Sequence, residues 1–364
     1  MRHLVFCFAF GLLACENTAA RDASGPPWLA CGASRSAEEA TASAFTMESS
    51  PTHLDGGAGL TTVKDRLIAL DLRDGRLSIK MRDSTIATFG ATGGGPGEFA
   101  PYGQSHRLRR YPVHWVDARS DTIVTFDGRR LSFFSAEGVY LGARVAPSGM
   151  VSGAVTVSNV RLWRGKVLIG TYDMGAMPKS RRALSVRAIS TTTDQLVADL
   201  ALPALPNAAG GRPFDGLSEA KPSWDLVGDC IVATDGHSDS LFVTDLLKGK
   251  AVAVVMPLPM HFRTGEERTE ARLLGTADLP LPLRPARVHT VVADPFGWIW
   301  MEPSAQPARL WPRIEVWRFH LQSQRFRVDT LSAFPLAWDS AGCGIGFGTD
   351  ANDAPQLVRM CRRK

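Results

Sequence analysis

The sequence has few of the features that mark a familiar catalytic or metal-binding site. It contains only eight histidines and six cysteines in 364 residues. It has no Cys-x-x-Cys pair and no cluster of histidine with cysteine, which argues against a zinc site. It also has no Gly-x-Ser-x-Gly motif, so the usual nucleophile turn of serine hydrolases is missing. No motif therefore predicts an enzyme mechanism.

Long apolar runs and a strong net charge are missing as well. Beyond the first 14 residues, no segment is apolar enough to cross a bilayer as a helix. The formal net charge is only +5, which is too small to predict a nucleic-acid partner. The hydrophobic share of 45% and the charged share of 21% are those of a globular protein with an ample core.

The first residues predict export. Residues 1–14 have a basic start at Arg2 and a short apolar run, which is typical of a removable signal peptide. Leu12-Leu13-Ala14-Cys15 resembles the lipobox of bacterial lipoproteins, which implies lipidation of Cys15 and a membrane anchor in the bacterial cell envelope, periplasmic or at the cell surface. Cleavage at a nearby Ala-x-Ala-like site is the alternative. Residues 15–41 are rich in Ala, Ser, Thr and Gly and predict a flexible tether.

The rest of the chain, residues 42–364, contains a repeated strand pattern in which Leu or Ile is followed, two residues later, by an apolar residue. The pattern recurs at intervals of roughly 50 residues, which is the period of a propeller blade. We therefore predict an all-β fold, a six-bladed antiparallel β-propeller. The pattern is centred at Leu77, Leu131, Leu184, Leu241, Ile314 and, loosely, Leu357.

The last repeat has room for only three strands before residue 364. We expect the segment around Phe45 to supply the fourth strand, because a closed ring leaves no open sheet edge. Within the blades, Asp117, Asp225, Asp294 and Asp339 are each predicted to open a turn after the first strand. An Asp at the first turn position bonds the nearby backbone, so these residues do not require a metal.

A glycine-rich segment carries a family resemblance. Gly90 and the run Gly93-Gly94-Gly95-Pro96-Gly97-Glu98-Phe99 resemble the junction of bacterial six-bladed propellers related to NHL-repeat proteins, many of them exported lipoproteins. Val116-Asp117 and the segment from Arg130 to Gly138 resemble a strand, turn and strand of that family. The resemblance covers roughly residues 60 to 361 and implies the propeller fold. It implies no particular substrate.

Cysteine use fits an oxidising compartment. With Cys7 removed and Cys15 lipidated, four cysteines remain, and they allow three pairings. Cys343 begins one strand of the last blade and Cys361 ends the next, so the two are predicted to lie opposite each other and form a disulfide. Cys31 and Cys230 are then left as the second pair.

Histidines supply the candidate pore residues. His114 and His289 fall on the first, innermost strands of their blades, where they can bind a metal or a carboxylate, or pack between blades. Propellers that resemble gluconolactonases or lyases hold Ca or Zn in the pore. The inner strands here offer aromatic and aliphatic residues rather than a set of carboxylates. The sequence therefore predicts no metal and no other cofactor, with Ca or Zn in the pore as the alternative.

The longest connections are predicted to lie on one face of the ring, which we call the long-loop face. They hold 17 of the 23 prolines and an excess of four positive charges, so they are stiffened for binding. We expect this face to bind a protein, peptide or glycan, without catalysis, and no nucleic acid. The alternative is a hydrolase or lyase with a pore metal. The loops are 90–112, 146–156, 173–182, 202–221, 257–287, 303–312 and 348–355, and their candidate contacts are Arg107, Arg109, Arg110, Arg181, Arg182 and Arg309.

Overall fold

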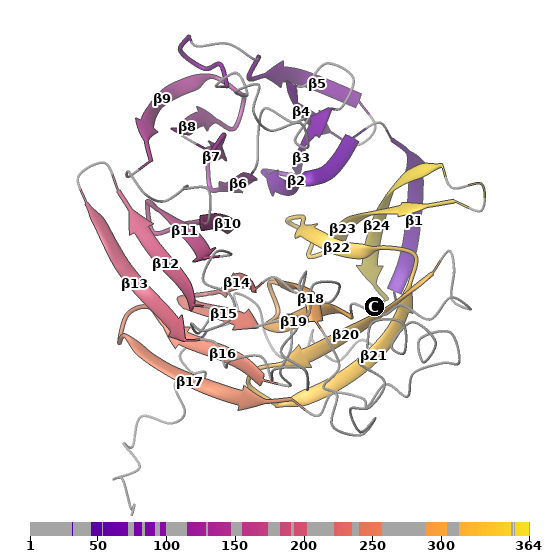
Figure 1. Ribbon diagram of the computed structural model, residues 1–364. Coiled ribbons are helices and arrows are strands. Elements are labelled where there is room, and N and C mark those ends of the chain that lie inside the picture. Colours follow the sequence, from indigo (N-terminus) through magenta and orange to yellow (C-terminus); the bar gives the residue numbers. More distant parts are fainter. Residues whose placement is uncertain are drawn as a thin grey trace, which may run out of the picture.

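The described residues form a closed ring of β-sheets. Their 24 strands make six four-stranded antiparallel sheets around a central axis (Figure 1). Within these residues, no helix has the length and apolar character needed to cross a membrane. The computed structural model describes residues 31, 45–52, 54–71, 76–81, 84–91, 95–99, 115–128, 130–146, 155–173, 183–190, 193–201, 222–234, 240–256, 288–303, 313–350, 352 and 354–363.

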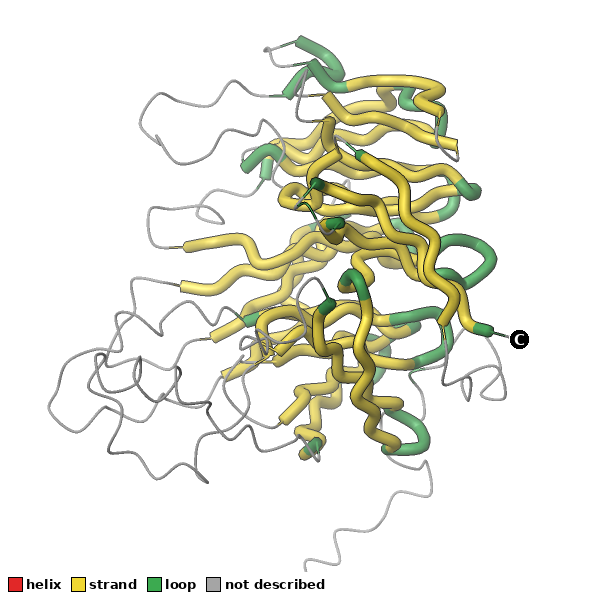
Figure 2. The backbone as a smooth tube through the Cα atoms, turned by 90° about the vertical axis from the view of Figure 1, so that its right-hand side faces the viewer, coloured by secondary structure: helices red, strands yellow, loops and turns green. Residues whose placement is uncertain are grey.

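Each sheet is one blade, and its strands A to D run from the axis to the rim (Figure 1). The side view shows these strands crossing the thickness of the ring (Figure 2). Blades 1 to 3 are β2 (Leu54–Val63), β3 (Arg66–Asp71), β4 (Arg76–Met81), β5 (Ser84–Phe89); β6 (Trp115–Arg119), β7 (Thr122–Phe126), β8 (Arg130–Ser135), β9 (Tyr140–Val145); and β10 (Val155–Trp163), β11 (Lys166–Asp173), β12 (Ala183–Ile189), β13 (Asp194–Ala201). Blades 4 to 6 are β14 (Ser223–Val227), β15 (Cys230–Thr234), β16 (Ser240–Asp245), β17 (Lys250–Val255); β18 (Val288–Ala293), β19 (Trp298–Pro303), β20 (Ile314–His320), β21 (Arg325–Leu331); and β22 (Phe334–Trp338), β23 (Gly344–Thr349), β24 (Pro355–Arg362), β1 (Phe45–Pro51).

The predicted repeat marks strand C of every blade, and the six-bladed fold is confirmed. The Leu at its centre is fully buried in blades 1 to 4, at Leu77, Leu131, Leu184 and Leu241. Each of these side chains belongs to the apolar cluster between its own blade and the next. The repeat therefore recurs because every blade needs an apolar residue at the centre of its contact with a neighbour.

The core consists of apolar clusters between consecutive blades rather than one central core. Six such clusters occur among the described residues, one at each junction around the ring. The cluster between blades 5 and 6 is rich in tryptophan, with Trp298 and Trp300 buried in it. Packing between sheets supplies the main stabilisation, since burial of apolar surface is the dominant favourable contribution to folding.

Strand β1 closes the ring, as predicted. It pairs with β24 over seven residues, from Phe45 opposite Arg362 to Pro51 opposite Gln356. Phe45 packs edge-on against Trp300, with ring centroids 5.4 Å apart. The fully buried guanidinium of Arg318 lies 4.9 Å from the Phe45 ring centroid. The closing strand is therefore held by its backbone ladder and by an aromatic anchor.

Both predicted disulfides are present. Cys343 is joined to Cys361 within blade 6, and Cys31 is joined to Cys230 at the start of β15. Of the predicted tether 15–41, only Cys31 is described, and its side chain is buried in the cluster between blades 4 and 5. Two disulfides indicate an oxidising compartment outside the cytoplasm.

The glycine-rich junction between blades 1 and 2 has a packing role. Gly90 has a φ of +77°, and a Cβ there would lie 2.1 Å from the ring of Phe99. Phe99 is fully buried, and its N–H donates to the carbonyl of Ala91 at 2.7 Å. Only glycine permits this close approach, so Gly90 and Phe99 together fix the path of the chain between the two blades.

The turn prediction is right in blades 5 and 6 and wrong in blades 2 and 4. Asp294 and Asp339 open four-residue turns; Asp294 Oδ1 accepts from the Phe296 N–H within its turn, and Asp339 Oδ1 accepts from the N–H of Cys343, which directly follows the turn. Asp117 and Asp225 instead lie inside β6 and β14. In those blades the chain reverses over two residues, beginning at Ser120 and at Gly228, each with positive φ. Such tight hairpins leave the strands longer than predicted.

Candidate functional site

The central channel contains a cavity of about 360 Å³ that is lined by all six inner strands. Its lining residues lie at the ends of these strands, next to the A–B turns. We call the face that carries the A–B and C–D turns the short-turn face. Blades 2 to 4 contribute the charged side chains, which are Asp117, Arg119, Arg161 and Asp225. Blades 5 and 6 contribute an apolar wall of Val292, Ala293, Pro295, Leu336, Ala337 and Trp338.

Side chains connect the inner strands of neighbouring blades. No backbone ladder joins these strands, so side-chain atoms satisfy some of their backbone polar groups instead. The bonds run from Ala118 N–H to Thr61 Oγ1 (3.1 Å), Leu162 N–H to Asp117 Oδ2 (2.7 Å), Asn159 Nδ2 to the Trp224 carbonyl (2.8 Å), Ala293 N–H to Asp225 Oδ2 (2.8 Å) and Thr62 Oγ1 to the Trp338 carbonyl (2.5 Å).

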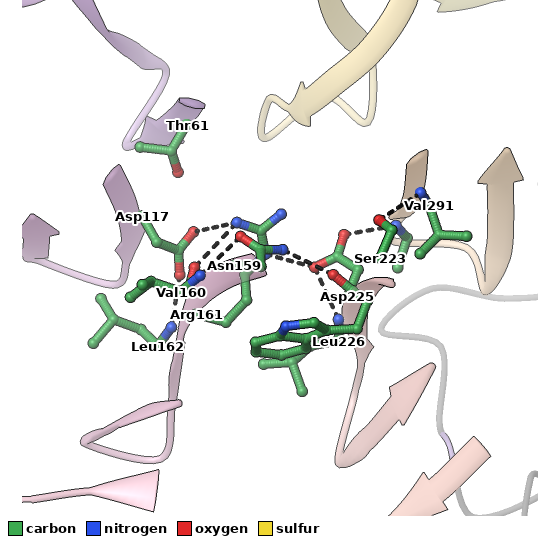
Figure 3. Close-up of polar contacts among 12 residues, drawn as sticks. Thr61, Asp117, Asn159, Val160, Arg161, Leu162, Ser223, Asp225, Leu226 and Val291 are labelled. Carbon is green, nitrogen blue, oxygen red and sulfur yellow. Dashed lines mark hydrogen bonds and ion pairs between the residues drawn. The ribbon is translucent and has the colours of Figure 1, made fainter. Parts of the chain in front are cut away.

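Arg161 lies between two carboxylates in the channel (Figure 3). Its Nε donates to Asp225 Oδ1 at 2.5 Å, and its Nη1 lies 3.9 Å from Asp117 Oδ1. Nη1 also donates to the carbonyl of Val160 at 3.2 Å. One guanidinium is therefore shared by two acids, and it is bonded more closely to Asp225 than to Asp117.

Burial and charge change the acidity of this cluster. Burial raises the pKa of Asp117 to about 6, although Arg161 and the Leu162 N–H oppose the rise. Burial also acts to lower the pKa of Arg161, but Asp225 and Asp117 outweigh it and hold that pKa above its usual value. Arg161 therefore stays cationic, while Asp117 changes charge close to neutral pH.

Two polar atoms of the cluster remain open to the cavity. Asp225 Oδ1 accepts from Arg161 and from the Leu226 N–H, and its Oδ2 accepts from Ala293. Asp117 Oδ2 accepts from Leu162 and the Ala118 N–H also acts on this carboxyl, while Asp117 Oδ1 lies 3.9 Å from Arg161 Nη1. Among the described residues, the hydrogen bonds of Arg161 engage Nε and Nη1, so Nη2 is the remaining donor of a side chain that lines the cavity. An acceptor and a donor thus lie next to each other, ready for a ligand.

Most site residues predicted from the sequence lie outside the described residues. This applies to Cys15, to His114 and to all six arginines of the long-loop face, which are Arg107, Arg109, Arg110, Arg181, Arg182 and Arg309. His289 belongs to β18, but only its backbone is described. These assignments stay predictions.

The inner strands were expected to offer aromatic and aliphatic residues rather than a set of carboxylates, and that expectation missed the charged cluster of Asp117, Arg161 and Asp225. One feature of the sequence could have revealed these residues, namely their position relative to the A–B hairpin of each blade. In blades 1 to 4, the third residue from the end of the inner strand is Thr61, Asp117, Arg161 and Asp225, respectively. Aligning the inner strands by their A–B turns would have placed these side chains at one level of the channel.

Comparison with known proteins supports the fold. No family model and no curated protein matches this chain. A protein from Bacteroides fragilis described as exported has 9% identity and a TM-score of 0.51, with 89% of this chain and 97% of that one covered. A gluconolactonase from Xanthomonas campestris has 13% identity and a TM-score of 0.42, with 90% and 93% covered. Regucalcin, a calcium-binding protein from Agrobacterium tumefaciens, has 12% identity and a TM-score of 0.46, with 86% and 93% covered. The match to the Bacteroides fragilis protein supports the propeller fold, and an identity this low shows no shared activity.

Proposed function

We propose that this protein is an exported binding protein that takes a small ligand in its central channel, without catalysis. The observation that carries the proposal is the pair of open polar atoms, Asp117 Oδ1 and Arg161 Nη2, in a cavity of about 360 Å³. Cavities that bind small molecules combine an apolar wall with a few placed polar groups. The match to an exported protein of the same fold and the two disulfides support export.

The chemistry of the cavity favours binding over catalysis. Asp225 has donors on both oxygens, so it is a poor nucleophile or base. The hydroxyls of Thr61 and Thr62 are engaged with backbone groups of neighbouring blades. Asp117 is the remaining acid, and a single acid has no partner to complete an acid–base pair.

A hydrolase or lyase with Ca or Zn in the channel fits these residues less well. The guanidinium of Arg161 already supplies the positive charge between Asp117 and Asp225. Calcium takes six to eight oxygen ligands, and the described residues contain no group of three or more acidic, histidine or cysteine side chains that could hold a metal. We therefore derive no reaction through a metal.

Ligand-observed NMR with a library of neutral, cationic and anionic metabolites tests the binding proposal. We expect compounds that bind the wild-type protein to bind the Arg161→Lys variant about tenfold more weakly, because lysine lacks the planar fork of donors. Arg164→Lys is the matched control, since Arg164 lies in the A–B turn of the same blade and pairs with Asp229 in a more exposed position. Equal affinity in all three proteins would rule out the channel as the site.

We also propose that lipidation at Cys15 anchors the mature chain to a membrane of the cell envelope. Replacing Cys15 with Ser removes the thiol that accepts the lipid. We expect the Cys15→Ser variant to move from the membrane fraction to the soluble fraction in a fractionation experiment. A variant that stays with the membrane would contradict lipid anchoring. The long-loop face, with its predicted arginine contacts, stays a second predicted surface for a protein, peptide or glycan.

A further inference from the structure

The charges of the cavity wall balance. Two acids, Asp117 and Asp225, and two arginines, Arg119 and Arg161, line the cavity, and no other lining residue is charged. Arg119 is exposed, whereas the other three are buried or half-buried and Arg161 pairs with both acids. An anion held beside Arg161 would therefore also lie close to the two carboxylates, and a cation held beside Asp117 would also lie close to the guanidinium of Arg161. Like charges brought together across an interface cost several kcal/mol, so the wall favours a neutral ligand.

The open polar atoms specify the kind of group that binds. Asp117 Oδ1 accepts hydrogen bonds when the acid is ionised, and Arg161 Nη2 only donates. The two groups lie side by side in Figure 3. A hydroxyl both donates and accepts. Two neighbouring hydroxyls can therefore bind both atoms at once, one donating to Asp117 and the other accepting from Arg161.

The opposite wall of the cavity suits the carbon skeleton of such a ligand. Blades 5 and 6 present aliphatic side chains together with the indole of Trp338. A sugar ring carries hydroxyls at its edge and apolar C–H groups on its faces, so it matches a cavity that is polar on one side and apolar on the other. Resting on the proposed binding function, we propose that the channel binds a neutral sugar unit, with its hydroxyls on Asp117 and Arg161 and its apolar face on the wall near Trp338.

Sugar rings of the same size but different charge test this inference. Glucose, glucosamine and glucuronate are neutral, cationic and anionic forms of one ring, and galactose, galactosamine and galacturonate form a second such set. By ligand-observed NMR, we expect a neutral member to bind about tenfold more tightly than its charged counterparts. Asp117→Asn and Arg161→Lys should each weaken that binding by about tenfold, and Arg164→Lys should leave it unchanged.

The outcomes separate this inference from the broader one. The sugar assignment is overturned if a charged ring binds more tightly than its neutral counterpart. It is also overturned if Arg161→Lys weakens the binding of other compounds but of no neutral sugar; in both cases, binding in the channel still holds. If Arg161→Lys weakens the binding of no compound, both proposals are overturned. Arg161→Lys keeps the positive charge between the two acids, so a folded variant is available even where Asp117→Asn perturbs the hydrogen bond to Leu162.

Discussion

Replacing Phe45 with Ala is expected to destabilise the protein by about 4 kcal/mol, which is the usual cost of removing a buried aromatic side chain. Phe45 is 9% exposed and belongs to the cluster between blades 5 and 6. It also covers the buried Arg318, whose guanidinium contacts Trp298 and Trp300 at 5.1 and 4.9 Å. Arg318 Nε donates to Asp329, whereas Nη1 and Nη2 have no hydrogen-bond partner within the part of the chain that the structure describes, so the aromatic rings are the main stabilising contacts of these two atoms.

The change should appear as a lower urea midpoint under non-reducing conditions, with an unchanged slope. Met47→Ala is the matched control, because Met47 lies in the same strand and is 41% exposed. We expect that control to change the free energy of unfolding by less than about 0.5 kcal/mol. If Phe45→Ala costs no more than Met47→Ala, then β1 does not close the ring through this anchor.

The second large effect concerns pH and Asp117. Its folded pKa of about 6 lies above the ordinary value of 3.8, so between these values the folded state holds a proton that the unfolded state has lost. Stability is favoured at low pH and falls as pH rises through this window. The difference corresponds to about 3 kcal/mol at most. We expect Asp117→Asn to remove this dependence.

The measurement is the free energy of unfolding of the wild type minus that of Asp117→Asn, taken at several pH values from 4 to 7. That difference should fall by up to about 3 kcal/mol over the range. Asp121→Asn provides the control, because Asp121 lies in the same hairpin with its side chain 70% exposed, and its replacement leaves the channel cluster intact. A flat curve for Asp117 would show that burial does not raise its pKa.

The blades could be predicted because each one repeats the same local requirement. A buried Leu at the centre of strand C, such as Leu77 or Leu131, recurs wherever a blade packs on its neighbour. The closing strand and both disulfides followed from that assignment. Alternation and turn residues suffice at this level, since they depend on neighbouring residues in the sequence.

The channel cluster could not be predicted by the same means. An Asp two residues before the end of a strand looks like an Asp that opens a turn, and only the two-residue hairpins at Ser120 and Gly228 decide between them. Arg161 gave no signal by itself, because its partners lie in two other blades. Its importance arises from the closure of the ring, which brings Asp117, Arg161 and Asp225 to one level of the channel.

A crystal structure with the tightest-binding neutral sugar of the panel would test the central claim most directly. The account predicts the sugar in the cavity between the six inner strands, with hydroxyl oxygens at about 3 Å from Arg161 Nη2 and Asp117 Oδ1. It also predicts the ring against the apolar wall near Trp338. A sugar bound on the long-loop face, with no ligand in contact with Arg161, would contradict it.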